Sequence, residues 1–207
     1  MSAEIEKFIL RSTLTSPFGR KVRMAAEVLG VDGRIVLVPA DTLDEGDTLR
    51  EQNPLGKLPC LLLPDGTVLY DSRVIIEFLQ ETAGTERLMP RAGVARDRAL
   101  TRAALADGIA DAALLMVYED RFRDTAMHSP RWLAHQRGKI MRGLSAFEAA
   151  LPGTGTDIVS IGLACALGYL DWRRPVDWRP SFPATARWLD AFTRHEPAVG
   201  RTRADAA

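Results

Sequence analysis

One stretch near the N-terminus decides the fold: residues 6–38 read EKFILRSTLTSPFGRKVRMAAEVLGVDGRIVLV. Residues 6–11 are rich in β-prone side chains and predict a strand. Ser16 suits the N-cap of a helix and Pro17 its first position, and apolar residues recur at helical spacing after them. Residues 34–38 then predict a second strand. A strand, a helix and a strand in this order favour a parallel pair with a right-handed crossover.

The next apolar stretches predict a β-hairpin followed by a helix. Residues 60–63 and 67–70 are β-prone, and Asp65-Gly66 between them favours a tight turn. The acidic connection that precedes this hairpin leaves room for a short helix. Ser72 is predicted to cap the helix that follows, whose apolar residues lie on one face. The predicted order over residues 1–82 is therefore βαβ, a connection and ββα.

A linker is predicted at residues 83–93, where glycine and proline gather among polar residues. Over residues 94–207 strand signals disappear, and apolar residues recur at helical spacing. Thr154 and Asp157 have the spacing of a capping box ahead of a buried helix over residues 158–170. The sequence thus predicts an α/β domain, a linker and an all-α domain.

The composition is that of an ordinary globular protein. The chain has 207 residues, of which 46% are hydrophobic and 26% charged. Basic and acidic residues number 27 each, so no overall field favours a nucleic acid or an anionic membrane as partner. The balance is uneven, however, because residues 1–82 carry 9 basic and 13 acidic side chains, a balance of −4, and the remainder has a balance of +4.

Signals for export, membrane insertion and metal binding are missing from the sequence. The first residues are acidic, unlike a secretory signal, and the longest nearly apolar stretch, residues 158–170, is too short to span a bilayer. The two cysteines, Cys60 and Cys165, form no CxxC pattern, and the three histidines form no ligand pattern. We therefore expect a cytoplasmic protein that holds no metal.

Three motifs, in this order, resemble those of the cytosolic glutathione transferase family. Residues 15–23, TSPFGRKVR, are similar to the serine-type active-site loop of its bacterial members. Residues 53–59, NPLGKLP, look like the family's segment around a cis-proline, and residues 70–72, YDS, resemble its pair of an acidic residue and a serine. The resemblance implies a thioredoxin-like N-terminal domain, an all-helical C-terminal domain and a glutathione transferase that acts in detoxification.

The resemblance also implies a glutathione site. The thiol would lie beside Ser16, and the tripeptide would pair with the Leu58 backbone ahead of a cis peptide bond. By charge, a lysine would meet the glycyl carboxylate, while an aspartate and a serine would hold the γ-glutamyl end. Each residue alone also suits an ordinary structural role as a helix cap, an edge residue or a surface charge. The residues assigned to glutathione are Ser16, Phe18, Lys57, Leu58, Pro59, Asp71 and Ser72.

The proposed chemistry of Ser16 is a hydrogen bond donated to the thiolate, which requires neither a base nor a metal. Ser12, Thr13 and Thr15 lie in the same loop and are alternative donors. Since a serine rather than a cysteine occupies this position, mixed-disulfide chemistry is disfavoured. Direct conjugation and glutathione-assisted isomerisation or reduction all fit this loop.

The electrophile, small and hydrophobic, is expected in a cleft between the domains. Met116, Tyr118 and Arg121 are candidate residues for that site, although core or surface roles fit them equally well. The resemblance further implies a homodimer in which the N-terminal domain of one subunit meets the helical domain of the other. The charge balances of −4 and +4 would then face each other.

Two rival functions fit the same motifs. One is a non-catalytic glutathione-binding or regulatory module of the same fold. The other is an isomerase or dehalogenase that uses glutathione. The chain also departs from the family pattern at two places, because Asp71 stands where a glutamate is common and residues 195–199 carry no clear family motif.

Overall fold

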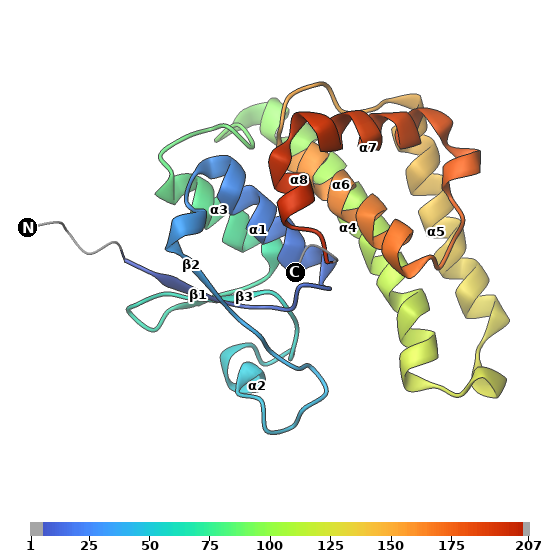
Figure 1. Ribbon diagram of the computed structural model, residues 1–207, viewed down its shortest axis with the longest axis horizontal. Helices are drawn as coiled ribbons and strands as arrows, with labels where there is room; N and C mark the ends of the chain where they lie inside the picture. Colours follow the sequence, from blue (N-terminus) through green and yellow to red (C-terminus); the bar gives the residue numbers. More distant parts are fainter. Residues whose placement is uncertain (1–5, 205–207) are drawn as a thin grey trace, which may run out of the picture. The chain divides into compact units, whose positions relative to one another are not determined.

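The computed structural model describes residues 6–204, which divide into two compact units. Among the described residues, the first unit contains residues 6–88 together with residues 200–204, and the second is Met89–Val199. Figure 1 shows a small sheet with helices in the first unit and helices in the second. The predicted fold class, an α/β part followed by an all-α part, is confirmed.

The sheet of the first unit has four strands in the order β2-β1-β3-β4. β1 pairs in parallel with β2 and antiparallel with β3, and β3 pairs antiparallel with β4. The predicted parallel pair and the predicted hairpin are therefore both present. The strands are β1 (Phe8–Arg11), β2 (Ile35–Val38), β3 (Cys60–Leu62) and β4 (Val68–Leu69).

The helices of the first unit follow short-range signals in the sequence, apart from the cap of α3. α1 and α3 pack against each other, and α2 is the short helix for which the acidic connection left room. α1 ends at Gly30, whose φ of 70° lies in the left-handed region that glycine adopts without strain. These helices are α1 (Pro17–Leu29), η1 (Asp32–Arg34), α2 (Leu49–Gln52) and α3 (Ser72–Thr82).

The predicted cap of α3 is wrong by one residue. Asp71 is the N-cap, and its carboxylate accepts the backbone N–H of Arg73 at 2.9 Å. Ser72 is the first residue of the helix and is only 2% exposed. Aspartate and serine cap helices about equally well, so the extended backbone at Asp71 decides which of the two takes the role.

The second unit is a helical assembly in which α4 packs against both α5 and α6. α6 is buried almost throughout residues 158–170, as its apolar sequence predicts. Close packing of α4 and α5 requires Gly143, because a Cβ there would lie 2.7 Å from Cγ1 of Ile109. The helices are α4 (Gly93–Phe122), η2 (Thr125–Met127), α5 (Pro130–Ala149), α6 (Ile158–Arg173), η3 (Arg179–Ser181) and α7 (Pro183–His195). α8 (Pro197–Arg201) begins in this unit, and its last two residues belong to the first.

The capping box ahead of α6 lies one turn later than predicted. Asp157, not Thr154, is the N-cap, and its carboxylate accepts the N–H groups of Val159 and Ser160. Ser160 completes the box by accepting the N–H of Asp157 at 2.8 Å. The prediction failed because Thr154 and Asp157 have the same spacing as Asp157 and Ser160, and the helix starts directly after Asp157, the first residue of the second pair.

Within residues 6–204, no helix is long and apolar enough to cross a membrane. No group of three histidine, cysteine, aspartate or glutamate side chains in this range is arranged to hold a metal ion. Cys60 and Cys165 are buried free cysteines. Burial raises the pKa of the Cys60 thiol to about 11, although the charge of Arg11 opposes this. Cys60 is therefore a core residue rather than a nucleophile at neutral pH.

Candidate active site

Ser16 is positioned by the start of α1. Its backbone is extended, with φ −73° and ψ 121°, and its Oγ accepts the backbone N–H of Gly19 at 3.1 Å. A hydroxyl that accepts one hydrogen bond keeps its own hydrogen for donation. The side chain can therefore cap the helix and at the same time donate to an acceptor placed beyond the helix end.

A second donor lies at the same helix end. Pro17 has no N–H, the N–H of Gly19 donates to Ser16 Oγ, and the N–H of Arg20 donates to the Ser16 carbonyl at 2.9 Å. This leaves the N–H of Phe18 as a first-turn donor with no partner within residues 6–204. An anion at this point would meet two hydrogen-bond donors and the positive end of the helix dipole.

The other hydroxyls of the loop have partners within the loop. Ser12 is fully buried, and its hydroxyl donates to the Thr13 carbonyl at 3.3 Å. The hydroxyls of Thr13 and Thr15 bond to each other at 3.1 Å. Ser12 also lies directly against α1, since a Cβ at Gly19 would lie 1.8 Å from Ser12 Oγ. Among the four candidates, Ser16 is the one placed at the helix end.

The segment before β3 presents free backbone groups. The Leu58–Pro59 peptide bond is cis, as the resemblance implies. The N–H and C=O of Leu58 have no partner within the described residues. Asn53, 2% exposed, shapes this turn because its side chain accepts the N–H of Leu55 and donates to the carbonyl of Lys57. The side chain of Lys57 is exposed.

The acidic residue at the start of α3 is held in its charged form. Burial by itself would raise the pKa of Asp71. Hydrogen bonds from the side chain and N–H of Arg73 and the charges of Arg73 and Lys21 outweigh burial, so the pKa lies below its ordinary value. Arg73 and Asp71 form an ion pair at 2.8 Å. A carboxylate at this position can still accept further donors, because each of its oxygens has two lone pairs.

Lys21 is a residue that the sequence analysis missed. It lies on α1, is only 1% exposed, and its charge lowers the pKa of Asp71. A sequence signal for it exists, because Lys21 stands four residues before Ala25 and seven before Val28, both buried. A lysine on the apolar face of a helix is uncommon and indicates an acidic neighbour.

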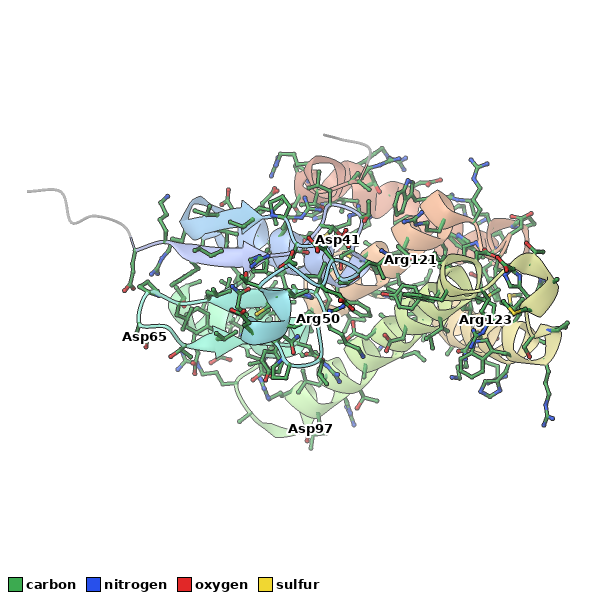
Figure 2. All side chains as sticks on the ribbon, turned by 90° about the horizontal axis from the view of Figure 1, so that it is seen from below. Asp41, Arg50, Asp65, Asp97, Arg121 and Arg123 are labelled. Carbon is green, nitrogen blue, oxygen red and sulfur yellow. The ribbon has the colours of Figure 1, made fainter. Side chains whose placement is uncertain are left out.

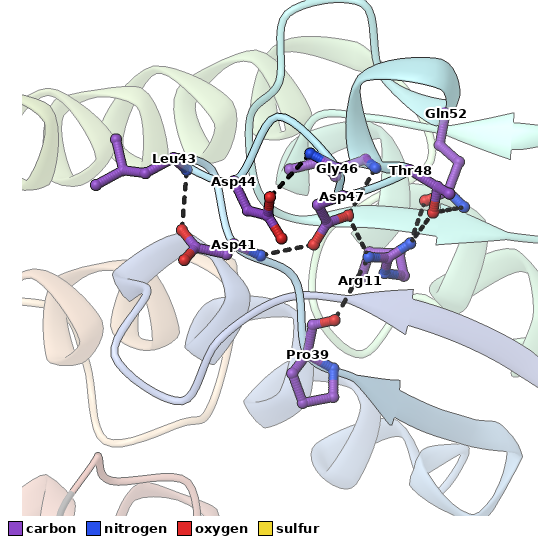
Figure 3. Close-up of polar contacts among 10 residues, drawn as sticks. Arg11, Pro39, Asp41, Leu43, Asp44, Gly46, Asp47, Thr48 and Gln52 are labelled. Carbon is purple, nitrogen blue, oxygen red and sulfur yellow. Dashed lines mark hydrogen bonds and ion pairs between the residues drawn. The ribbon is translucent and has the colours of Figure 1, made fainter.

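Arg11 anchors the connection that precedes the cis-proline segment (Figure 3). At the end of β1 its guanidinium forms an ion pair with Asp47 at 2.6 Å. It also donates to Gln52 at 2.8 Å and to Thr48 at 3.0 Å, so it contacts the residue before α2 and the last residue of α2. Asn53 follows directly. The network thus connects the sheet to the turn that contains Lys57.

Asp47 also holds the backbone of this connection. Its carboxylate accepts the N–H of Asp41 and the N–H of Leu49, each at 2.7 Å. These two hydrogen bonds are the main reason that the pKa of Asp47 is lowered, with Arg11 adding to them and burial opposing them.

The second unit contains a cavity of about 610 Å³ at the end of α4. Of the three residues predicted for the electrophile, Tyr118 lines this cavity, and Met116 and Arg121 do not. Arg121 and Arg123 are labelled near this end of α4 in Figure 2. The cavity is lined by Leu115, Tyr118, Glu119, Phe122, Arg123, Met127, Ser129 and Trp132.

Tyr118 and Arg121 also share a cluster with residues of α6. The guanidinium of Arg121 lies 5.8 Å from the centre of the Tyr118 ring. Burial raises the pKa of Tyr169, and Tyr118 adds to this while Arg173 and Arg121 oppose it. Nothing in the sequence distinguishes Tyr169 and Arg173 from the other residues of α6 as members of a site.

The chain is similar to known proteins over most of its length. Residues 15–82 match the family model of the glutathione S-transferase N-terminal domain. The uncharacterized GST-like protein YibF of Escherichia coli strain K12 is 36% identical over 200 residues, which cover 91% of this chain and 98% of YibF.

Two solved structures extend this similarity to three dimensions. One is a glutathione transferase family member from Pseudomonas fluorescens Pf-5 that was solved with bound glutathione. It is 41% identical to this chain and has a TM-score of 0.89, and the match covers 95% of this chain and 98% of the Pseudomonas chain. A glutathione S-transferase from Methylobacillus flagellatus KT with glutathione bound is 33% identical, with a TM-score of 0.87 and coverage of 95% and 99%.

Proposed function

Because the chain belongs to the glutathione S-transferase family, we propose that it binds glutathione and activates its thiol as a thiolate for attack on a small hydrophobic electrophile. The observation that carries this proposal is the pair of donors at the start of α1, the hydroxyl of Ser16 and the N–H of Phe18. Glutathione is a co-substrate here, and the chemistry assigns no role to a metal.

The strength of these interactions is sufficient for activation. A free thiol has a pKa of about 8.5, so roughly 2.7 kcal/mol of preference for the thiolate is needed to lower it by about two units. A hydrogen bond to a charged group contributes about 1.5–3 kcal/mol. The end of a helix adds about 0.3–1 kcal/mol. One hydroxyl with a helix end therefore reaches the required range, and the N–H of Phe18 adds a further donor.

The rest of the tripeptide is assigned to groups of the first unit. The free N–H and C=O of Leu58 can pair with the cysteinyl backbone, as an added strand would. Lys57 is assigned to the glycyl carboxylate by charge. The ionised carboxylate of Asp71 suits the α-ammonium group, and Ser72 suits the α-carboxylate.

The reaction then proceeds without a protein base. The thiol proton leaves to solvent, and Ser16 keeps its own proton while it donates a hydrogen bond to the sulfur. The sulfur lone pair forms a bond to the electrophilic carbon, and the electron pair displaced there leaves with a leaving group or is protonated by water. We assign Met116, Tyr118 and Arg121 to the electrophile, and of these three Tyr118 is the one that lines the cavity at the end of α4.

The proposal includes the organisation of the chain. We propose residues 1–82 as the glutathione-binding domain, residues 83–93 as the linker and residues 94–207 as the helical domain of a cytoplasmic homodimer, with residues 200–204 packed on the first unit. Sedimentation at micromolar concentration tests the dimer, and the mass of one subunit would contradict it.

A glutathione titration of the wild type and of Ser16→Ala tests the function. Thermal stability reports binding, and thiolate ultraviolet absorbance reports activation. A transferase shows both effects in the wild type and loses the second in the variant. A binding module shows only the stabilisation, and a protein that does not use glutathione shows neither. Thr15→Val is the matched control, because it removes a neighbouring hydroxyl that bonds to Thr13.

A further inference from the structure

The end of the described chain returns to the first unit. Residues 200–204, here called the tail segment, follow the helical unit in sequence but cluster with the first unit. Thr202 is only 1% exposed, and Figure 1 shows this end of the chain beside α1. The tail segment is therefore packed as part of the unit that contains Ser16.

Side chains of α1 hold the tail segment. Arg23 Nη2 donates to the Thr202 carbonyl at 2.9 Å, and Arg20 Nε donates to Thr202 Oγ1 at 3.4 Å. Arg201 forms an ion pair with Glu27 at 2.7 Å. These contacts join α1 to residues 174 to 182 positions later in the chain.

Arg23 also contacts the loop that contains Ser16. The same Nη2 that donates to Thr202 lies 3.4 Å from the carbonyl oxygen of Leu14, two residues before Ser16. One guanidinium nitrogen is thus shared between the tail segment and the active-site loop, defined here as residues 12–16. Removing the Thr202 carbonyl would therefore remove one of the contacts that hold Arg23 beside the Leu14 carbonyl.

Burial makes this arrangement energetically significant. Arg20 is 7% exposed, and the Nε of Arg23 is buried. Charge-assisted hydrogen bonds are stronger than neutral ones, and a buried charge that loses its partner is strongly unfavourable. Without the tail segment, the two arginines would move toward water, and the contact with Leu14 would change with them.

We propose that the tail segment positions the thiol site: Thr202 holds Arg23, and Arg23 holds the loop that places the Ser16 hydroxyl at the start of α1. Both are positioning residues and contact no reacting atom. This inference rests on the proposed function of Ser16. A hydroxyl that stabilises an anion must be held within about 0.5 Å of its productive position, so a loose loop lowers the thiolate fraction before it lowers glutathione affinity.

The test compares the wild type with a variant that ends at Arg201 and with Arg23→Gln. We expect the pKa of the bound glutathione thiol to rise by about half a unit to one unit in both variants, which lowers the ratio of thiolate to thiol about 3- to 10-fold. The dissociation constant for glutathione should change less than about twofold. Arg23→Lys should recover part of the thiolate. Arg34→Gln, an arginine of the same unit bonded to Glu6, is the matched control and should leave the thiolate fraction unchanged.

The outcomes separate this inference from the proposed function. Wild-type thiolate in the variant that ends at Arg201 would overturn the inference and leave the function intact. If that variant does not fold, Arg23→Gln decides by the same readout. If the wild type itself forms no thiolate, the proposed function fails, and amide hydrogen exchange of residues 13–16 decides instead. Faster exchange without the tail segment supports the positioning role, and unchanged exchange contradicts it.

Discussion

The Oγ of Ser16 accepts the backbone N–H of Gly19 at 3.1 Å, so one hydroxyl both caps α1 and keeps a hydrogen for a ligand. Capping uses a lone pair of the hydroxyl oxygen, and stabilisation of the thiolate uses the hydroxyl hydrogen. A substitution can therefore remove thiolate stabilisation and keep the helix cap.

Replacing Ser16 by aspartate should separate capping from activation. Aspartate caps a helix as well as serine does, so Ser16→Asp should keep the thermal stability, whereas Ser16→Ala should lose about 1 kcal/mol. Both should lose thiolate formation, because alanine has no donor and a carboxylate repels the sulfur anion. Differential scanning calorimetry and ultraviolet titration measure the two effects. Thiolate formation in Ser16→Asp at the wild-type level would refute the role of the hydroxyl.

Gly19 should tolerate no side chain while Ser12 is present. A Cβ at this position would lie 1.8 Å from Ser12 Oγ, so Gly19→Ala should destabilise the protein by about 1–3 kcal/mol through overpacking. The double variant with Ser12→Gly should recover most of this loss. Chemical denaturation measures both. Gly155→Ala is the control, since a Cβ there meets no atom within 4 Å, and an equal loss in that control would contradict the explanation.

Asp47→Asn should lower the melting temperature at neutral pH, with an effect that fades in acid. The folded pKa of Asp47 lies below its ordinary value of 3.8, so its stabilisation is complete above that value and is lost as the pH falls through the folded pKa. The difference in melting temperature between wild type and variant should therefore shrink below about pH 4. A difference that stays constant down to pH 2 would contradict the network around Arg11.

Asp71→Asn should weaken glutathione binding by about tenfold, because the amide lacks the charge that attracts the α-ammonium group. Asparagine caps a helix as well as aspartate does, but the lowered pKa of Asp71 means that its charge also stabilises the fold, so the melting temperature of the free protein should fall modestly at neutral pH. Isothermal titration calorimetry measures the affinity. Asp65→Asn is the control, since its pKa is also lowered, chiefly by the backbone N–H of Thr67, but it lies in the hairpin turn. Equal weakening in both variants would show that the effect is not local.

The start of α1 shows why some of this site could be predicted. Ser16 and Pro17 determine the start of the helix through the hydrogen bonds of three or four neighbouring residues, and such signals are complete in the sequence. The hairpin around Asp65-Gly66 is predictable for the same reason. Where two capping residues compete, as at Asp71 and Ser72, the backbone conformation decides, and the sequence holds no information on that choice.

The sequence by itself thus determined the order of the elements, the motif that contains Ser16 and the family resemblance, because each rests on residues close together in the chain. Only the tertiary structure decided the charge of Lys21 acting on Asp71, the pairing of Arg11 with Asp47 and the contact of Arg23 with Thr202. The members of each pair lie tens of residues apart or more. Which distant charge or carbonyl meets a buried cation depends on how the helices and strands pack, and packing is not encoded in local spacing.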